Sequence, residues 1–175
     1  DGEQGTVRRL ALTRDLRRAM ETDQLVLYCQ PKIDIASGAV CGAEMLARWN
    51  HPELGAISPG EFIALAERTG LIKPLTYWVT NETARNLHEI QKKGQGLPLA
   101  INISVRNLRD PELIERIRGI CATWGIPPAR LQLELTESAL MEDHEAARAV
   151  LIRLHDMGFA LHIDDFGTGY SSLAY

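Results

Sequence analysis

The sequence predicts an α/β domain that forms part of a (β/α)-type barrel. Two strand-like segments, residues 25–31 and 39–49, are joined by a link that is too short for a helical crossover, so we expect an antiparallel hairpin. From residue 58 onward, helix-like and strand-like segments alternate, as in parallel βαβ units. Five strands do not close an eight-stranded barrel, and about 75 more residues would complete one of about 250. We therefore expect the N-terminal portion of a barrel, present as a truncated part-barrel.

The other elements follow from hydrophobic periodicity and capping residues. Residues 1–9 are polar and contain glycine, which is typical of a linker or an expression remnant, and the domain is expected to span residues 10–175. Its lead-in helix covers residues 10–20. A capping box with proline at the first helical position, Ser58-Pro59-Gly60-Glu61, begins the next helix. Further helices are expected at 76–92, from 110 to about 124 and around 146–154, and further strands at 97–104, 131–135 and 160–163.

Composition indicates one globular domain with a sizeable core, because 45% of the 175 residues are apolar and the formal net charge is -4. Basic residues are scattered, so no duplex nucleic acid is expected as a partner. No apolar run approaches the roughly 20 residues of a membrane span, and we expect a cytoplasmic domain that makes no membrane contact. The odd number of cysteines, Cys29, Cys41 and Cys121, without metal-binding spacing, indicates reduced core residues.

Oxygen ligands recur at the ends of the predicted strands. Glu44, Asn102 and Glu134 lie in the second, third and fourth strands, and Asp164 with Asp165 follows the fifth. In parallel α/β folds the active site lies at the carboxyl ends of the strands. Carboxylates and an amide, without histidine or thiolate, favour a hard cation such as Mg²⁺, Mn²⁺ or Ca²⁺ over zinc.

Each of these residues also has a purely structural interpretation. A strand glutamate such as Glu44 is often a paired or rim residue, and Asn102 is of a type common in turns. Glu134 and Glu137 are also compatible with the start of a helix, where acids favour the helix dipole. Adjacent acids have few structural explanations, because each buried carboxylate needs a cation or a donor. It is the recurrence at strand ends that indicates one site.

The motifs that carry these residues resemble those of one family. Glu44-Met45-Leu46 is followed by Arg48-Trp49, and the later motifs are Asn102-Ile103-Ser104, Glu134-Leu135-Thr136-Glu137 and the segment 164–173, which reads DDFGTGYSSL. Their order, spacing and strand placement resemble the EAL-domain family of cyclic di-GMP phosphodiesterases, from the lead-in helix to the last residue.

The resemblance implies a modified TIM-type (β/α)8 barrel whose first strand is antiparallel, and hydrolysis of the bacterial second messenger cyclic di-GMP to linear pGpG by two ions of Mg²⁺ or Mn²⁺. Glu44, Asp164 and Asp165 are the implied catalytic residues. The implied metal ligands are Glu44, Asn102, Glu134 and Asp164 on one ion, with Asp165 on the second and Asp164 bridging the two.

Further roles are implied by the same resemblance. Arg48 matches an arginine that grips a ligand phosphate, Gln30 a glutamine that holds the ligand, and Pro59 and Glu67 lie in the segment expected beside a guanine base. The implied loop that couples metal binding to dimerisation comprises Phe166, Gly167, Thr168 and Gly169, with Glu137 as its anchor. The implied partners are cyclic di-GMP, a second copy of the chain, and an upstream sensory or GGDEF-type domain.

Two departures qualify the resemblance. Met45 replaces the alanine that names the family, a change expected to be harmless because position 45 packs while Glu44 binds the metal. Family members also carry, beyond the point where this sequence stops, a lysine and a glutamate that complete the second metal site and activate water, and a glutamine near the ligand. Residues 1–175 alone are therefore expected to have low or no activity, although the intact domain is expected to be an enzyme.

Two alternative functions remain open. A degenerate EAL-like receptor would bind cyclic di-GMP without cleaving it, and such proteins usually lose metal ligands, which this sequence retains. A purely structural or dimerisation domain would leave the acids at the strand ends without a purpose.

Overall fold

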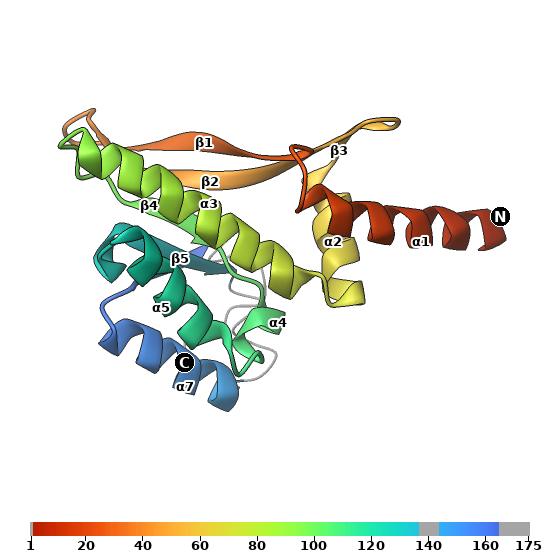
Figure 1. Ribbon diagram of the computed structural model, residues 1–175. Helices are drawn as coiled ribbons and strands as arrows, with labels where there is room; N and C mark the ends of the chain where they lie inside the picture. The colour runs from red at the N-terminus through yellow and green to blue at the C-terminus, as the bar shows by residue number, and fades with distance from the viewer. Residues whose placement is uncertain (1, 137–143, 165–175) are drawn as a thin grey trace.

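The computed structural model describes residues 2–136 and 144–164, which form one curved sheet covered by helices (Figure 1). The six-stranded sheet has the order β1-β2-β4-β5-β6, and β3 pairs with β2 outside this path. The strands are β1 (Leu25–Ile33), β2 (Val40–His51), β3 (Gly55–Ile57), β4 (Leu99–Asn102), β5 (Leu131–Thr136) and β6 (Ala160–Asp164). The helices are α1 (Gly2–Ala19), α2 (Pro59–Thr69), α3 (Ile72–Lys92), α4 (Val105–Leu108), α5 (Leu113–Trp124), the 3₁₀ turn η1 (Pro128–Arg130) and α7 (His144–Asp156).

The strand directions confirm the predicted fold class. β1 and β2 pair antiparallel from Leu25↔Trp49 to Lys32↔Gly42, and Gly38 in the turn between them has a φ of 69°, a conformation that favours glycine. The pairs β2–β4, β4–β5 and β5–β6 are all parallel. Helices α3, α5 and α7 lie on one face of the sheet (Figure 1). The described residues thus form a part-barrel with an antiparallel first strand.

The two faces of the sheet have opposite character. Met45, Ile101 and Leu133 are at most 5% exposed and belong to the hydrophobic core that the helices cover. Their chain neighbours Glu44 and Asn102 project to the other face, because successive side chains of a strand alternate. The apolar positions bury the sheet against the helices, and the polar positions are left for the concave interior.

Several boundaries differ from the predictions. α1 begins at Gly2 rather than near residue 10, because residues 2–9 contain no proline and include good helix formers such as glutamine and arginine. β3 and α4 were not predicted, because segments of three and four residues carry too little periodicity to be recognised.

The prediction that all three cysteines are core residues is wrong for two of them. Cys121 is buried, and burial raises the pKa of its thiol to about 11. Cys29 and Cys41 are exposed. Cys41 lies where the hairpin register shifts after Lys32, so it leaves the strand alternation, and its thiol donates to the Lys32 carbonyl at 3.4 Å.

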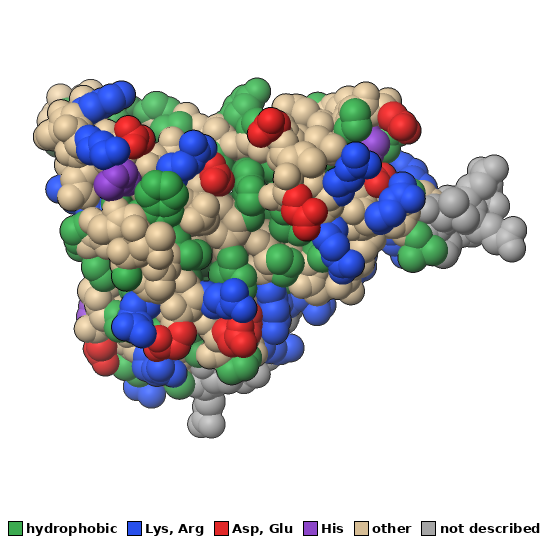
Figure 2. Space-filling view, in the orientation of Figure 1, with side chains coloured by type: hydrophobic (Ala, Val, Ile, Leu, Met, Phe, Trp, Pro, Cys, Tyr) green, Lys and Arg blue, Asp and Glu red, His purple; other side chains and the backbone are tan. Residues whose placement is uncertain are grey.

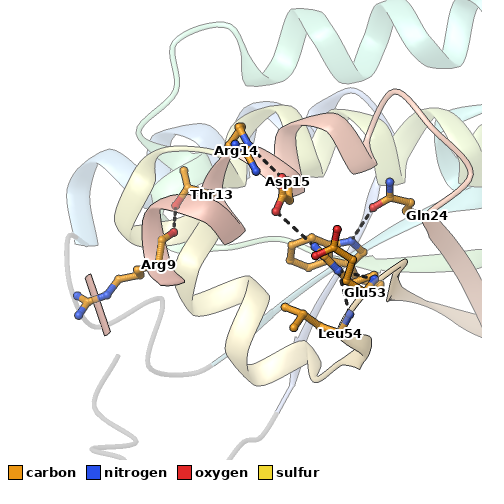
Figure 3. A network of polar contacts seen from close by, with 9 residues as sticks. Arg9, Thr13, Arg14, Asp15, Gln24, Glu53 and Leu54 are labelled. Carbon is orange, nitrogen blue, oxygen red and sulfur yellow. Dashed lines mark hydrogen bonds and ion pairs between the residues drawn. The ribbon is translucent and has the colours of Figure 1, made fainter. Parts of the chain in front are cut away.

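Helix α1 is connected to the sheet by a buried histidine, His51, at the end of β2. Its partners Asp15 of α1 and Glu53 and Leu54 of the following turn are labelled in Figure 3. His51 Nδ1 accepts hydrogen bonds from the backbone N–H groups of Glu53 and Leu54, so its Nε2 faces Asp15 of α1, at 3.4 Å. Burial alone would raise the pKa of the Asp15 carboxyl, but hydrogen bonds from Arg14 and His51 lower it below its ordinary value. These bonds connect the helix to the β2–β3 turn.

A buried acid, Asp110, joins α3 to α5. Asp110, which is 8% exposed, accepts hydrogen bonds from the Tyr77 hydroxyl at 2.6 Å and from the Glu112 backbone at 3.2 Å, and Lys73 lies 3.5 Å away. Burial alone would raise the pKa of Asp110, but these three partners together lower it below 3.8. The same pairing and burial raise the pKa of the Tyr77 hydroxyl.

We predict that Asp110→Asn lowers the free energy of unfolding by about 1–2 kcal/mol at pH 7, because hydrogen bonds to a charged acceptor are weakened. A carboxyl whose pKa is lowered on folding stabilises the fold above its unfolded pKa of about 3.9, and this contribution is lost as pH falls through the folded value. The difference between variant and wild type should therefore shrink between pH 5 and pH 2 in urea titrations. Glu115→Gln, at an exposed ion pair, is the control and should change little. A difference that does not depend on pH would contradict this assignment.

Candidate functional site

The strand register gathers the predicted ligands at one end of the sheet. Glu44 of β2 pairs with Ala100 of β4, and Asn102, two residues further along β4, pairs with Glu134 of β5. Asp164, at the end of β6, pairs with Thr136. Because paired residues of neighbouring strands share a face, Glu44, Asn102 and Glu134 all face the concave interior.

Glu44 and Asn102 contact each other directly. The Asn102 Nδ2 amide donates a hydrogen bond of 2.6 Å to Glu44 Oε1, although the two residues are 58 positions apart in the sequence. Within the described residues, neither Asn102 Oδ1 nor the second Glu44 oxygen accepts a hydrogen bond from a protein donor. The contact orients the carboxylate and leaves one oxygen of each side chain available to a cation.

Glu134 is the buried acid of the site. It is 5% exposed, and its Oε1 forms an ion pair with the ammonium of Lys32 from β1. His162 of β6, its register partner, places Nδ1 3.9 Å from the same oxygen. An isolated buried carboxylate is costly, so the ammonium of Lys32 compensates the charge of Glu134.

The donor set has the chemistry of a hard-cation site. Glu44, Asn102 and Glu134 offer carboxylate and amide oxygens, which suit Mg²⁺ or Mn²⁺. The Lys32 ammonium already forms an ion pair with Glu134. Within residues 2–136 and 144–164, no group of three or more histidine, cysteine or acidic side chains is arranged to hold a metal. The described residues therefore fit a divalent cation but do not by themselves complete its coordination.

The candidate phosphate-binding residues lie along the β1–β2 hairpin. Gln30 pairs in register with Glu44 and is exposed. The Arg48 guanidinium lies 5.5 Å from the centre of the Tyr28 ring and donates to the Ala47 carbonyl at 2.9 Å. Stacking on an aromatic ring restricts the guanidinium plane while leaving other N–H donors for a ligand.

Pro59 and Glu67 were expected beside a guanine base, and of these two Glu67 contacts the strand end of the site. Ser58 caps α2 by accepting a hydrogen bond from the Glu61 backbone, and Pro59 follows at the exposed first turn. The carboxylate of Glu61 pairs with Arg8 at 2.9 Å. From the last turns of the same helix, Glu67 accepts a hydrogen bond of 2.7 Å from Ser104, just beyond β4. Glu67 thus reaches the strand end where Asn102 lies.

The remaining candidates lie outside the described residues. These are Asp165, Glu137, Phe166, Gly167, Thr168 and Gly169. Their roles, and the side-chain role of Asp164, stay predictions.

Four residues of the site were assigned no role from the sequence: Lys32, His162, Ser104 and Tyr28. A sequence pattern did exist for Lys32 and Tyr28, because each lies two positions from Gln30 on the same strand and so shares its face. His162 likewise precedes Asp164 by two positions in β6.

A mixed α/β part-barrel with hard-oxygen donors at its strand ends defines a class of barrel proteins suited to metal-assisted chemistry. The chain belongs to the EAL domain family, whose match covers residues 13–175.

Relatives and solved structures agree with this assignment. The chain is 42% identical over 165 residues to the cyclic di-GMP phosphodiesterase PdeR of Escherichia coli, covering 94% of this chain and 25% of that protein. It is 42% identical over 167 residues to the bifunctional diguanylate cyclase/cyclic di-GMP phosphodiesterase MucR of Pseudomonas aeruginosa, covering 95% and 24%. The structure of the MucR phosphodiesterase in complex with c-di-GMP has a TM-score of 0.87 and 41% identity, covering 93% of this chain and 66% of that one.

The chain spans about a quarter of the length of these two curated relatives. No helix among the described residues is long and apolar enough to cross a membrane. On the face shown in Figure 2, acidic and basic side chains are interspersed rather than gathered by sign.

We predict that Ser104→Ala lowers the free energy of unfolding by about 1 kcal/mol, because the hydroxyl caps α4 through the Arg106 backbone and donates to Glu67. Ser104→Thr retains a hydroxyl and is the matched control, expected to stay closer to wild type in urea unfolding. Equal losses in both variants would show that the hydroxyl is not the stabilising group.

Proposed function

We propose that the protein containing this domain hydrolyses cyclic di-GMP to linear pGpG, using two divalent metal ions, and so ends cyclic di-GMP signalling. The observation that carries the proposal is the gathering of Glu44, Asn102 and Glu134 from three strands onto one concave face. Relatives that are 42% identical are named as cyclic di-GMP phosphodiesterases, which supports the same substrate.

The proposed ligands of one Mg²⁺ or Mn²⁺ are Glu44, Asn102, Glu134 and Asp164, with Asp165 on the second ion. When bound, two such ions acidify a water molecule and stabilise the charge that develops on the phosphoryl group. The protein's contribution is orientation: Asn102 holds the Glu44 carboxylate by its amide N–H, and each side chain keeps one further oxygen for a cation.

The proposed substrate contacts use the hairpin and α2. Arg48 is suited to a phosphate because its fork of N–H donors matches phosphate oxygens, and its contact with Tyr28 limits its orientations. Gln30 lies beside Glu44 in register and supplies an amide to the ligand. Glu67 keeps one carboxylate oxygen beyond its bond to Ser104, and a carboxylate accepts from the N–H donors of guanine. Pro59 is proposed to lie beside the same base.

The larger organisation is proposed from the family. The domain is proposed to comprise residues 10–175 together with further barrel strands. Glu137 is proposed to anchor the loop of Phe166, Gly167, Thr168 and Gly169, and this loop to couple metal binding to a homodimer. An upstream sensory or GGDEF-type domain is proposed, supported by the bifunctional name of MucR.

We predict that the full-length gene product converts cyclic di-GMP to pGpG in the presence of Mg²⁺ or Mn²⁺, measured by chromatography of the products. Glu44→Ala should lower kcat/KM by more than the roughly 10–100-fold that follows loss of a residue supporting a metal ligand. Glu115→Ala, on the exposed surface of α5, is the control and should retain activity. Ligand binding without any turnover by the wild-type protein would assign it to the receptor class instead.

We also predict that residues 1–175 alone show little or no hydrolysis under the same conditions. Within the described residues, β1 and β6 are the edges of an open sheet, so the concave face is not enclosed. The assay compares this chain with the full-length gene product at equal concentration. Comparable metal-dependent turnover by the two would refute the requirement for further strands.

A further inference from the structure

The ion pair between Lys32 and Glu134 joins two strands that are not neighbours. Lys32 belongs to β1 and Glu134 to β5, with β2 and β4 between them in the sheet. Three strand spacings amount to about 14 Å along a flat sheet. The contact therefore crosses the concave interior, where the curvature of the sheet brings the ends of the two strands' side chains together.

The pair is strongly asymmetric in burial. The Glu134 side chain is 7% exposed, whereas that of Lys32 is 31% exposed. The carboxylate has little access to water to stabilise its charge, whereas the lysine side chain is partly exposed and its ammonium sits on a flexible four-carbon stem. The buried Glu134 carboxylate therefore needs the ion pair more than the partly exposed Lys32 ammonium does.

Among the described residues, no basic side chain other than Lys32 lies within hydrogen-bonding distance of Glu134 Oε1. The Arg48 guanidinium is engaged with Tyr28 and the Ala47 carbonyl. His162 is 3.9 Å from Glu134 Oε1, beyond hydrogen-bonding distance, and its side chain is 46% exposed. Lys32 is thus the close cationic partner of Glu134 among these groups.

We propose that Lys32 is a built-in counter-ion for Glu134 that a divalent cation must displace, so that Lys32 sets the metal affinity of the site. This inference rests on the proposed function in one respect, the role of Glu134 as a metal ligand. Without metal, Lys32 neutralises a buried carboxylate whose charge would otherwise destabilise the fold. A metal ion at the same oxygen repels the ammonium, and the lysine stem swings away while β1 stays in place.

The first test is Mn²⁺ binding by isothermal titration calorimetry on the full-length gene product, comparing wild type with Lys32→Met. Removing the competing charge should tighten Mn²⁺ binding by about tenfold, the effect of a charge partner worth one pKa unit. Lys92→Met is the matched control, because Lys92 pairs with exposed Glu89 on α3 and should leave the affinity unchanged. Lys32→Arg, which keeps the charge, should bind Mn²⁺ no more tightly than wild type.

A second readout uses the metal-free protein. Lys32→Met should have a lower melting temperature than Lys92→Met in EDTA, and Mn²⁺ should recover most of the difference, because the metal replaces the lost cation at Glu134.

A third readout needs no variant. Acetylation of Lys32 in the wild-type protein, measured by mass spectrometry, should increase relative to acetylation of Lys92 when Mn²⁺ releases the Lys32 amine. This measurement decides the question even if Lys32→Met does not fold.

The outcomes separate the two proposals. Tighter Mn²⁺ binding by Lys32→Met supports the counter-ion role, and so does Mn²⁺ binding by this variant alone. Equal or weaker binding by Lys32→Met, with normal binding by wild type, overturns the role of Lys32 and leaves the metal site standing. Absence of Mn²⁺ binding from every protein overturns both the proposed metal site and the role of Lys32.

Discussion

The pairing register of β2, β4 and β5 is the constraint on which the rest of the site depends. A slip of one residue would turn Asn102 and Glu134 toward the helices and Ile101 and Leu133 toward the interior. The buried positions prevent this slip, because Ile101 and Leu133 are 0% exposed beneath the helices. Core packing on one face thus fixes which side chains face the concave interior on the other.

This arrangement concentrates acids on a concave surface, and the structure counters the resulting repulsion in two ways. Asn102 donates to Glu44, and Lys32 pairs with Glu134. Both partners are polar side chains on the concave face rather than members of the packed core. The site is therefore held together without metal while its oxygens remain suited to one.

The sequence was sufficient for the fold class and for the positions at the strand ends, because alternation and the short hairpin link are local patterns. Glu44 and Asn102 could be assigned to one site because polar residues interrupted otherwise apolar strands. The partner of Glu134 was not predictable, since the contact with Lys32 depends on how far the sheet curves across two intervening strands. The bond from Ser104 to Glu67 likewise depends on the packing of α2 against the end of β4.

The same alternation explains why methionine is compatible with the motif at position 45. Met45 is 5% exposed and lies on the helix-covered face, opposite to its neighbour Glu44. A change there alters the volume of the core, and methionine is well suited to fill irregular space. A change at Glu44 would instead remove an acid that Asn102 orients. Position 45 of the motif is therefore constrained by packing in the core, whereas position 44 is constrained by the chemistry of the concave face.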